Sequence, residues 1–152
     1  VVTDGTNSFW ASPYEANKEF GGKTFVPPNK IFSEYFRGDD NRKDMFSIKN
    51  TTIAIVATDL DLSKVELKRV SVAAHDGISR AIVPSHTPYD GDLVFAVSTA
   101  RRKIKIEQSD IYNIGHAASI CLSRAIARGV YEATPSKNDI LPTWKEVENK
   151  RL

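Results

Sequence analysis

The fold class is decided by residues 51–99, which read TTIAIVATDLDLSKVELKRVSVAAHDGISRAIVPSHTPYDGDLVFAVST. The stretch opens and closes on short apolar runs, at 51–58 and 92–99, and such runs predict strands buried on both faces. Between them, apolar residues recur at steps of three and four over residues 63–82, which predicts an amphipathic helix. The sequence therefore predicts a strand, a helix and a second strand in succession.

Local signals mark the helix ends. Ser63 and Glu66 match a capping box, in which the serine hydroxyl and the glutamate carboxylate each accept a free backbone N–H, and Pro84 ends the helix that follows. A second helix is predicted over residues 109–131. Its apolar face comprises Ile111, Ile114, Ala118, Cys121, Ala125 and Ile126. The alternation of strands and helices predicts an α/β layered fold.

Composition and charge describe an ordinary globular protein. The chain has 152 residues, a length typical of one domain, with 41% hydrophobic and 26% charged residues. Its formal net charge is only +2, so charge gives no reason to expect a nucleic-acid partner. The densest basic run, at residues 101–103, is predicted to be a solvated strand end or turn. No apolar run approaches the ~18 residues of a membrane-spanning helix, so no membrane partner is predicted.

The chain has one cysteine, Cys121, and therefore cannot form an internal disulfide. This fits a reducing compartment, and we predict a cytoplasmic protein. Cys121 falls within the apolar part of the second predicted helix, where we expect it to be a small core residue.

The two ends of the chain differ from the region of strands and helices. Residues 1–50 combine aromatic side chains with turn residues and are interpreted as an irregular segment draped over another part of the protein. Residues 135–152 are polar, with Trp144 as the expected anchor. The chain begins with Val1, and its two strands and two helices make a thin core. We therefore expect it to be part of a longer protein whose upstream chain completes the sheets.

Two polar motifs stand at the starts of the two predicted strands. One is Asn50-Thr51-Thr52, and the other is the block HTPYDGD at residues 86–92. Because both lie at strand starts, both could meet at one end of a sheet. Each motif also has a structural interpretation, since Asn-x-Thr is a glycosylation acceptor in secreted proteins and Asp-Gly-Asp is a common turn.

Other familiar site motifs are absent from the sequence. It contains no GxSxG elbow, no P-loop, no HExxH and no cysteine cluster. His75 and His116 fall within predicted helices and are interpreted as packed or surface residues rather than ligands.

Taken together, the two motifs resemble the L-aminopeptidase D-amidase/D-esterase family, which includes the β-peptidyl aminopeptidases and the 6-aminohexanoate-oligomer endohydrolase, the nylon hydrolase. The resemblance rests on NTTIAIVATD at residues 50–59, on AAHDGISRAIVPSHTPYDGDLVFAVST at residues 73–99, and on their separation. It covers residues 50–130 well and residues 1–49 loosely. A threonine after Asn50 resembles the nylon-hydrolase branch, because the aminopeptidase branches usually carry serine there.

The resemblance implies a self-cleaving amide hydrolase. Family members cut their own precursor before a serine or threonine, and the freed residue becomes the nucleophile. In this sequence the cut falls between Asn50 and Thr51, so the implied nucleophile is Thr51. The two acidic residues of the family fall on Asp90 and Asp92 and are expected beside the nucleophile. The family also places a lysine and an asparagine from the upstream chain at the site, and neither maps onto residues 1–50.

The same resemblance implies the fold and the assembly. The expected fold is a four-layer αββα sandwich with strands from both cleavage products. Residues 1–50 would then end the upstream chain, and residues 51–152 would form the downstream chain. An oligomer of processed heterodimers is expected, acting on a small peptide or amide-oligomer substrate. No cofactor and no metal are implied.

Cleavage before Thr51 would give the threonine a free α-amino group beside its hydroxyl. Such a group titrates near ~7.7–8.0, well below a lysine side chain at ~10.4. Part of it is therefore neutral at pH 7 and can take the hydroxyl proton, which activates the nucleophile. Two other hypotheses stay open. One is an acyltransferase similar to ornithine acetyltransferase, in which an amine rather than water resolves the ester. The other is a non-catalytic protein that keeps the fold. The sequence does not distinguish peptides, β-peptides and 6-aminohexanoate oligomers as substrates.

Overall fold

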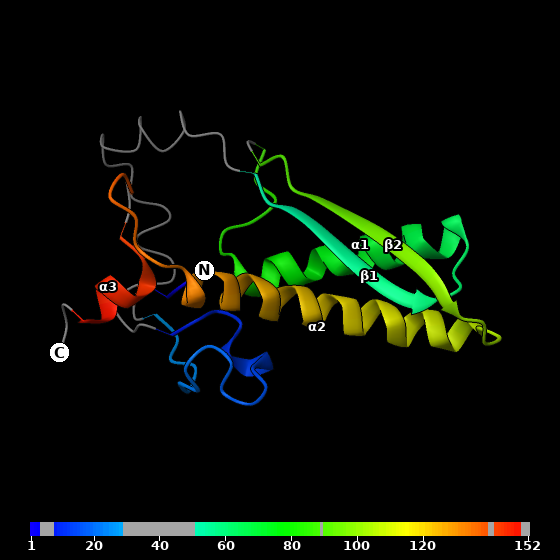
Figure 1. The fold of residues 1–152 in the computed structure, drawn as a ribbon, viewed down its shortest axis with the longest axis horizontal. Helices are drawn as coiled ribbons and strands as arrows, with labels where there is room; N and C mark the ends of the chain where they lie inside the picture. The colour runs from blue at the N-terminus through cyan, green and yellow to red at the C-terminus, as the bar shows by residue number, and fades with distance from the viewer. Residues whose placement is uncertain (4–7, 29–50, 89, 140–141, 150–152) are drawn as a thin grey trace.

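The computed structural model describes residues 1–3, 8–28, 51–88, 90–139 and 142–149. Its elements in chain order are η1 (Ser12–Tyr14), β1 (Ile53–Leu60), α1 (Lys64–Ala81), β2 (Leu93–Arg102), α2 (Gln108–Glu132) and α3 (Trp144–Asn149). The predicted strands and helices are present, with bounds that differ from the expected ones by a few residues. Figure 1 shows β1 and β2 running side by side, with α1 and α2 packed along them. No helix in the described parts of the chain is long and apolar enough to cross a membrane.

The two strands pair in parallel. Ile53 lies opposite Leu93, and the register continues until Thr58 lies opposite Ser98. Parallel strands need a crossover connection, and α1 supplies it. The α/β prediction is confirmed. Within the described residues the sheet has these two strands, so the four-layer sandwich stays a prediction.

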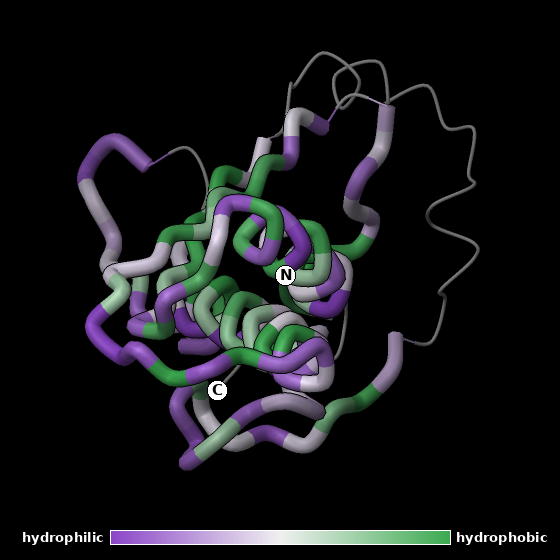
Figure 2. The backbone as a smooth tube through the Cα atoms, turned by 90° about the vertical axis from the view of Figure 1, so that its right-hand side faces the viewer, coloured by the Kyte–Doolittle hydropathy of each residue, from purple (hydrophilic) through white to green (hydrophobic). Residues whose placement is uncertain are grey.

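One hydrophobic core lies between the sheet and the helices. Its buried members are Ala74, Ile78, Val94 and Leu122. Ala54 and Val56 of β1 pack against it, because alternate side chains of a strand point to the same face. In Figure 2 the hydrophobic colour runs through the strands and helices, while the outer segments are mainly hydrophilic.

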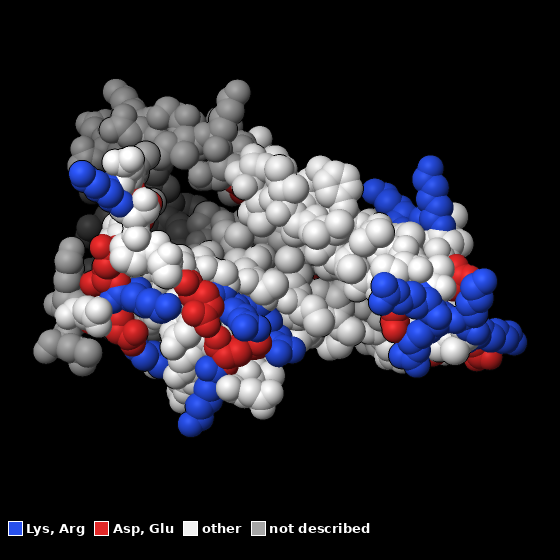
Figure 3. All heavy atoms as spheres, viewed as in Figure 1, with Lys and Arg blue, Asp and Glu red and all other residues white. Residues whose placement is uncertain are grey.

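The opposite face of the sheet is apolar and exposed. Its residues, whose exposed fractions run from 40% to 71%, are Ile53, Ile55, Leu93, Phe95 and Val97. The described helices cover one face of the sheet alone, so burial of the strands on both faces stays a prediction that depends on chain beyond this sequence. Figure 3 shows charged side chains gathered at the two ends of the molecule, with an uncharged band across the middle.

The ends of α1 follow the sequence signals. Ser63 Oγ accepts the Glu66 backbone N–H at 3.3 Å, and the Glu66 carboxylate accepts the Ser63 N–H at 2.7 Å. The predicted capping box is therefore confirmed. The helix ends at Ala81, shortly before Pro84, because proline cannot continue the helical hydrogen bonds.

Helices α1 and α2 approach each other closely through small residues. A Cβ placed on Gly77 of α1 would lie 2.4 Å from the carbonyl oxygen of Ser119 in α2. The buried residues of α2 are Gly115, Ser119, Leu122, Ser123 and Ala127. The prediction of Cys121 as a core residue is wrong: it is exposed, because the small residues rather than Cys121 face α1.

Residues 8–28 pack against α2 and α3. Phe9, Phe20 and Trp144 are buried, with the ring centroid of Phe9 5.4 Å from that of Phe20 and 4.9 Å from that of Trp144. Arg124 of α2 donates through Nε to the Glu19 carboxylate at 2.5 Å. The described part of the N-terminal segment is thus draped over the helices as expected, and Trp144 anchors the C-terminal segment as predicted.

Candidate active site

The starts of β1 and β2 lie side by side and bring the two sequence motifs together. The Leu93 backbone N–H donates to the Thr52 carbonyl oxygen at 2.9 Å, which fixes the beginning of the strand pair. Thr51 precedes β1 and is exposed, while Asp92 directly precedes β2. The prediction that the motifs meet at one end of a sheet is confirmed, and the roles of their side chains stay predictions.

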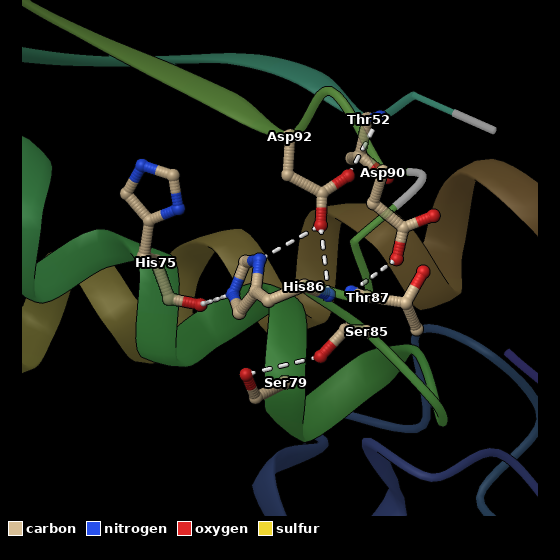
Figure 4. Close-up of polar contacts among 8 residues, drawn as sticks. All are labelled: Thr52, His75, Ser79, Ser85, His86, Thr87, Asp90 and Asp92. Carbon is tan, nitrogen blue, oxygen red and sulfur yellow. Dashed lines mark hydrogen bonds and ion pairs between the residues drawn. The ribbon is translucent and has the colours of Figure 1, made fainter. Parts of the chain in front are cut away.

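Asp92 connects the start of β1 with the turn before β2. Its side chain is 7% exposed. Asp92 Oδ1 accepts the Thr52 backbone N–H at 2.9 Å, and Oδ2 accepts the His86 backbone N–H at 3.3 Å. The same Oδ2 lies 2.8 Å from His86 Nδ1 (Figure 4). One carboxylate therefore ties together two segments that are far apart in the sequence.

Gly91 brings the turn into contact with the candidate nucleophile. A Cβ placed on Gly91 would lie 2.9 Å from Thr51 Oγ1 and 3.5 Å from Thr51 Cγ2. The Thr51 hydroxyl therefore lies against the backbone of Gly91, next in sequence to Asp92. A hydroxyl group and a carboxylate are thus grouped at the same end of the sheet, which suits nucleophilic attack assisted by an acidic side chain.

Asp90 shapes its own turn. Its Oδ2 accepts the Thr87 backbone N–H at 2.8 Å, and its own N–H donates to the Thr87 carbonyl oxygen at 3.0 Å. Figure 4 shows the two carboxylates turned to different partners, Asp90 to Thr87 and Asp92 to His86. These contacts support the turn interpretation of Asp90, and its catalytic role stays a prediction.

Sequence reasoning missed the contacts of His86. Its Nε2 lies 3.3 Å from the His75 carbonyl oxygen in α1, and the two imidazole centroids are 5.3 Å apart. The predicted packed or surface position of His75 is confirmed, since its ring is half-buried against His86. The available signal was the place of His86 at the head of the HTPYDGD block.

One residue of the predicted site is not described by the structure. Asn50 is outside the described residues, so the structure describes only Thr51 of the two residues at the proposed cut.

Across the described parts of the chain, no group of three or more His, Cys, Asp or Glu side chains is arranged to hold a metal ion. An apolar hollow of about 370 Å³ lies between β1 and α2, and neither Thr51 nor Asp92 lines it.

The fold and the site together define an α/β protein with a threonine hydroxyl and a buried carboxylate at the starts of two parallel strands. Residues 14–139 match the family model of peptidase family S58. The match covers well over half of the sequence, so the chain belongs to this family.

Curated relatives agree with this assignment. An uncharacterized aminopeptidase of Mycobacterium tuberculosis is 38% identical over 108 residues, which are 64% of this chain and 31% of the relative. An uncharacterized aminopeptidase of Mycobacterium leprae is 40% identical over 110 residues, 66% of this chain and 30% of the relative. A 6-aminohexanoate-oligomer endohydrolase of Paenarthrobacter ureafaciens is 44% identical over 50 residues, 33% of this chain and 14% of the relative.

Each of these matches covers only part of the relative's sequence. The chain spans about a third of the length of the aminopeptidases that it matches. The match to the nylon-oligomer hydrolase covers a third of this chain, against about two thirds for the mycobacterial aminopeptidases. The family expected from the sequence is therefore confirmed, while its nylon-hydrolase branch stays a proposal.

Proposed function

We propose that this chain carries the nucleophile, Thr51, and the acidic side chains, Asp90 and Asp92, of a self-processing amide hydrolase of the aminopeptidase type. The observation that carries the proposal is the hydrogen bond from the Thr52 N–H to Asp92 Oδ1 at 2.9 Å, with Gly91 packed against the Thr51 hydroxyl. Membership of peptidase family S58 and the similarity to mycobacterial aminopeptidases support the reaction class.

In the proposed maturation step, Thr51 Oγ1 attacks the carbonyl carbon of Asn50. The hydroxyl proton passes to a carboxylate, because a threonine hydroxyl is a poor nucleophile without a base. The amide bond breaks as its nitrogen takes a proton, which leaves an ester between Asn50 and the Thr51 hydroxyl. Water hydrolyses this ester and leaves a free carboxyl group on Asn50 and a free amino group on Thr51.

In the proposed turnover, the new amino group of Thr51 serves as the base. An α-amino group titrates near ~7.7–8.0, so a useful fraction is neutral at neutral pH and can take the hydroxyl proton. Thr51 then attacks the substrate carbonyl, the amine product leaves with a proton, and water hydrolyses the acyl ester. Asp92 orients Thr51 through the Thr52 N–H, and Asp90 contributes negative charge beside the amino group.

The proposed substrates are small peptides with a free N-terminus. The names of the mycobacterial relatives support this class. The 50-residue match to 6-aminohexanoate-oligomer endohydrolases supports a narrower proposal, in which amide oligomers of 6-aminohexanoate are also cut. The working form is proposed to be an oligomer of processed heterodimers.

The N-terminus of the purified whole protein tests the proposal. Edman sequencing or intact mass should find a chain that begins Thr51-Thr52-Ile53. The variant Thr51→Ala should neither cut itself nor hydrolyse substrate, whereas Thr51→Ser should keep part of both activities because a hydroxyl remains. Normal self-cleavage in Thr51→Ala would show that the nucleophile is another residue.

Two further readouts separate the alternative reaction classes. Transfer of the acyl group to an added amine in preference to water would indicate an acyltransferase. A wild-type protein that stays uncut and inactive on both substrate classes would indicate a non-catalytic role.

A further inference from the structure

We propose that His86 is a positioning residue that holds the Asp92 carboxylate against the start of β1 and thereby fixes Thr51. The inference rests on the proposed role of Thr51 as the nucleophile. Asp92 Oδ2 accepts the His86 backbone N–H at 3.3 Å and lies 2.8 Å from His86 Nδ1, while Oδ1 holds the Thr52 N–H. His86 therefore restrains one oxygen of the carboxylate while the other oxygen restrains β1.

The far side of the His86 ring is held by α1. Its Nε2 lies 3.3 Å from the His75 carbonyl oxygen, and the His75 ring packs against it at an angle of 54°. A carboxylate accepts hydrogen bonds, so the 2.8 Å contact fits a hydrogen bond that His86 Nδ1–H donates to Asp92. A hydrogen bond to an ionised carboxylate is charge-assisted and is stronger than a neutral one.

The position of Thr51 depends on this arrangement. Thr51 is exposed, and the next residue, Thr52, is held by its N–H on Asp92 and by its carbonyl oxygen on the Leu93 N–H. Without His86, the Asp92 carboxylate can rotate away from the Thr52 N–H. The strands stay paired through the Leu93 N–H and the Thr52 carbonyl oxygen, but the peptide between Thr51 and Thr52 loses the hydrogen bond that its N–H makes with Asp92. The expected effect is on the rate of bond formation rather than on substrate binding.

The backbone at residue 86 decides which replacements are informative. Its φ is 55°, in the left-handed region that favours glycine and that asparagine and aspartate tolerate. His86→Gly therefore removes the ring without backbone strain. His86→Asn places its side-chain Nδ2 where the imidazole has Nδ1, because both atoms are bonded to Cγ, and it can still donate to Asp92. His86→Asp has the shape of asparagine but repels the Asp92 carboxylate.

The test compares these three variants in the whole protein. His86→Gly and His86→Asp should lower both Thr51-dependent self-cleavage and kcat by about tenfold or more, with little change in KM. His86→Asn should restore most of the rate. The matched control is His116→Asn, at an exposed histidine of α2, which should behave as wild type. Circular dichroism and thermal melting should show a retained fold in each variant.

Wild-type rates in His86→Gly and His86→Asp, or equal losses in His86→Asn and His86→Asp, would overturn the positioning role. The second outcome would mean that the ring matters for its shape rather than for its bond to Asp92. The isosteric asparagine and aspartate pair keeps the comparison valid if the glycine variant fails to fold. Parallel measurement of Thr51→Ala separates the two proposals, because normal cleavage in that variant contradicts the proposed function itself.

Discussion

The two carboxylates of the HTPYDGD block have different partners, although one residue separates them in sequence. Asp92 accepts the N–H of Thr52, directly before β1, whereas Asp90 accepts the Thr87 N–H of its own turn. Loss of the Asp92 carboxylate therefore acts on a neighbouring strand, and loss of the Asp90 carboxylate acts first on the local turn. Substitutions at these two residues can separate catalytic charge from turn geometry.

We expect Asp92→Ala and Asp90→Asn each to slow self-cleavage and turnover by ~10²-fold or more, the usual contribution of an acid–base partner. Asparagine at residue 90 keeps a side chain that forms such turns but removes the charge. The rates are measured by the appearance of the Thr51 N-terminus and by amine release. Near-wild-type rates in Asp90→Asn would show that Asp90 shapes the turn and has no catalytic role.

Gly91→Ala should disturb the site more than the fold. The added Cβ would lie 2.9 Å from Thr51 Oγ1, and the exposed threonine side chain can rotate away from it. We therefore expect little change in Tm and a clear fall in the fraction of cut chain. Gly129→Ala is the control, since in the described part of the chain its added Cβ has no neighbour within 4 Å apart from the adjacent backbone of its own helix. A large fall in Tm together with normal cleavage would contradict this expectation.

Periodicity and end signals were sufficient to predict the secondary-structure elements. The capping box at Ser63 and the proline at residue 84 placed α1 correctly, because each acts within one turn of the helix. The buried face of α2 was misplaced at Cys121, because close helix packing selects small residues such as Gly115 over larger apolar ones. The periodicity of apolar residues does not show which of them face a neighbouring helix.

The same distinction applies to the candidate site. Thr51 and Asp92 could be expected to meet, because the starts of neighbouring parallel strands share one edge of a sheet. The contacts of His86 with Asp92 and with the His75 carbonyl oxygen join a turn, a strand start and a helix. No local pattern in the sequence encodes such a contact, so it could not be predicted.

The contact between α1 and α2 should be sensitive to a single methyl group. A Cβ on Gly77 would lie 2.4 Å from the Ser119 carbonyl oxygen, so Gly77→Ala must push the helices apart. We expect a loss of ~1–3 kcal/mol in the free energy of unfolding, the usual cost of overpacking. Urea denaturation measures it.

The control for Gly77→Ala is again an alanine introduced at an open helical glycine. Gly129→Ala should leave the free energy of unfolding unchanged or raise it by up to ~1 kcal/mol, because alanine favours the helix and the added Cβ has no described neighbour within 4 Å beyond its own helix backbone. Equal stability of the two variants would show that the helices adjust freely at Gly77.

At the scale of the whole molecule, the attachment of the N-terminal segment should depend on pH. The hydrogen bond from Arg124 holds the pKa of Glu19 below its ordinary value. A carboxyl group with a lowered folded-state pKa stabilises the fold above its unfolded pKa, and this contribution is lost as pH falls through the folded value.

We therefore expect Glu19→Gln to destabilise the protein at neutral pH and to have a diminishing effect as pH falls below the ordinary glutamate range near ~4.3. Chemical denaturation of both proteins over a pH series measures the difference. A stability difference that does not change with pH would mean that the Glu19 charge is not responsible.

The packing of residues 8–28 on α2 and α3 has a consequence for the proposed cut. Phe9, Phe20 and Glu19 lie before the Asn50–Thr51 bond, and their partners Trp144 and Arg124 lie after it. Cleavage would turn a single folding unit into a complex of two molecules held by these contacts. Its folding would then be a bimolecular association governed by mass action. Dilution should lower the Tm of the cut protein more than that of the uncut Thr51→Ala protein.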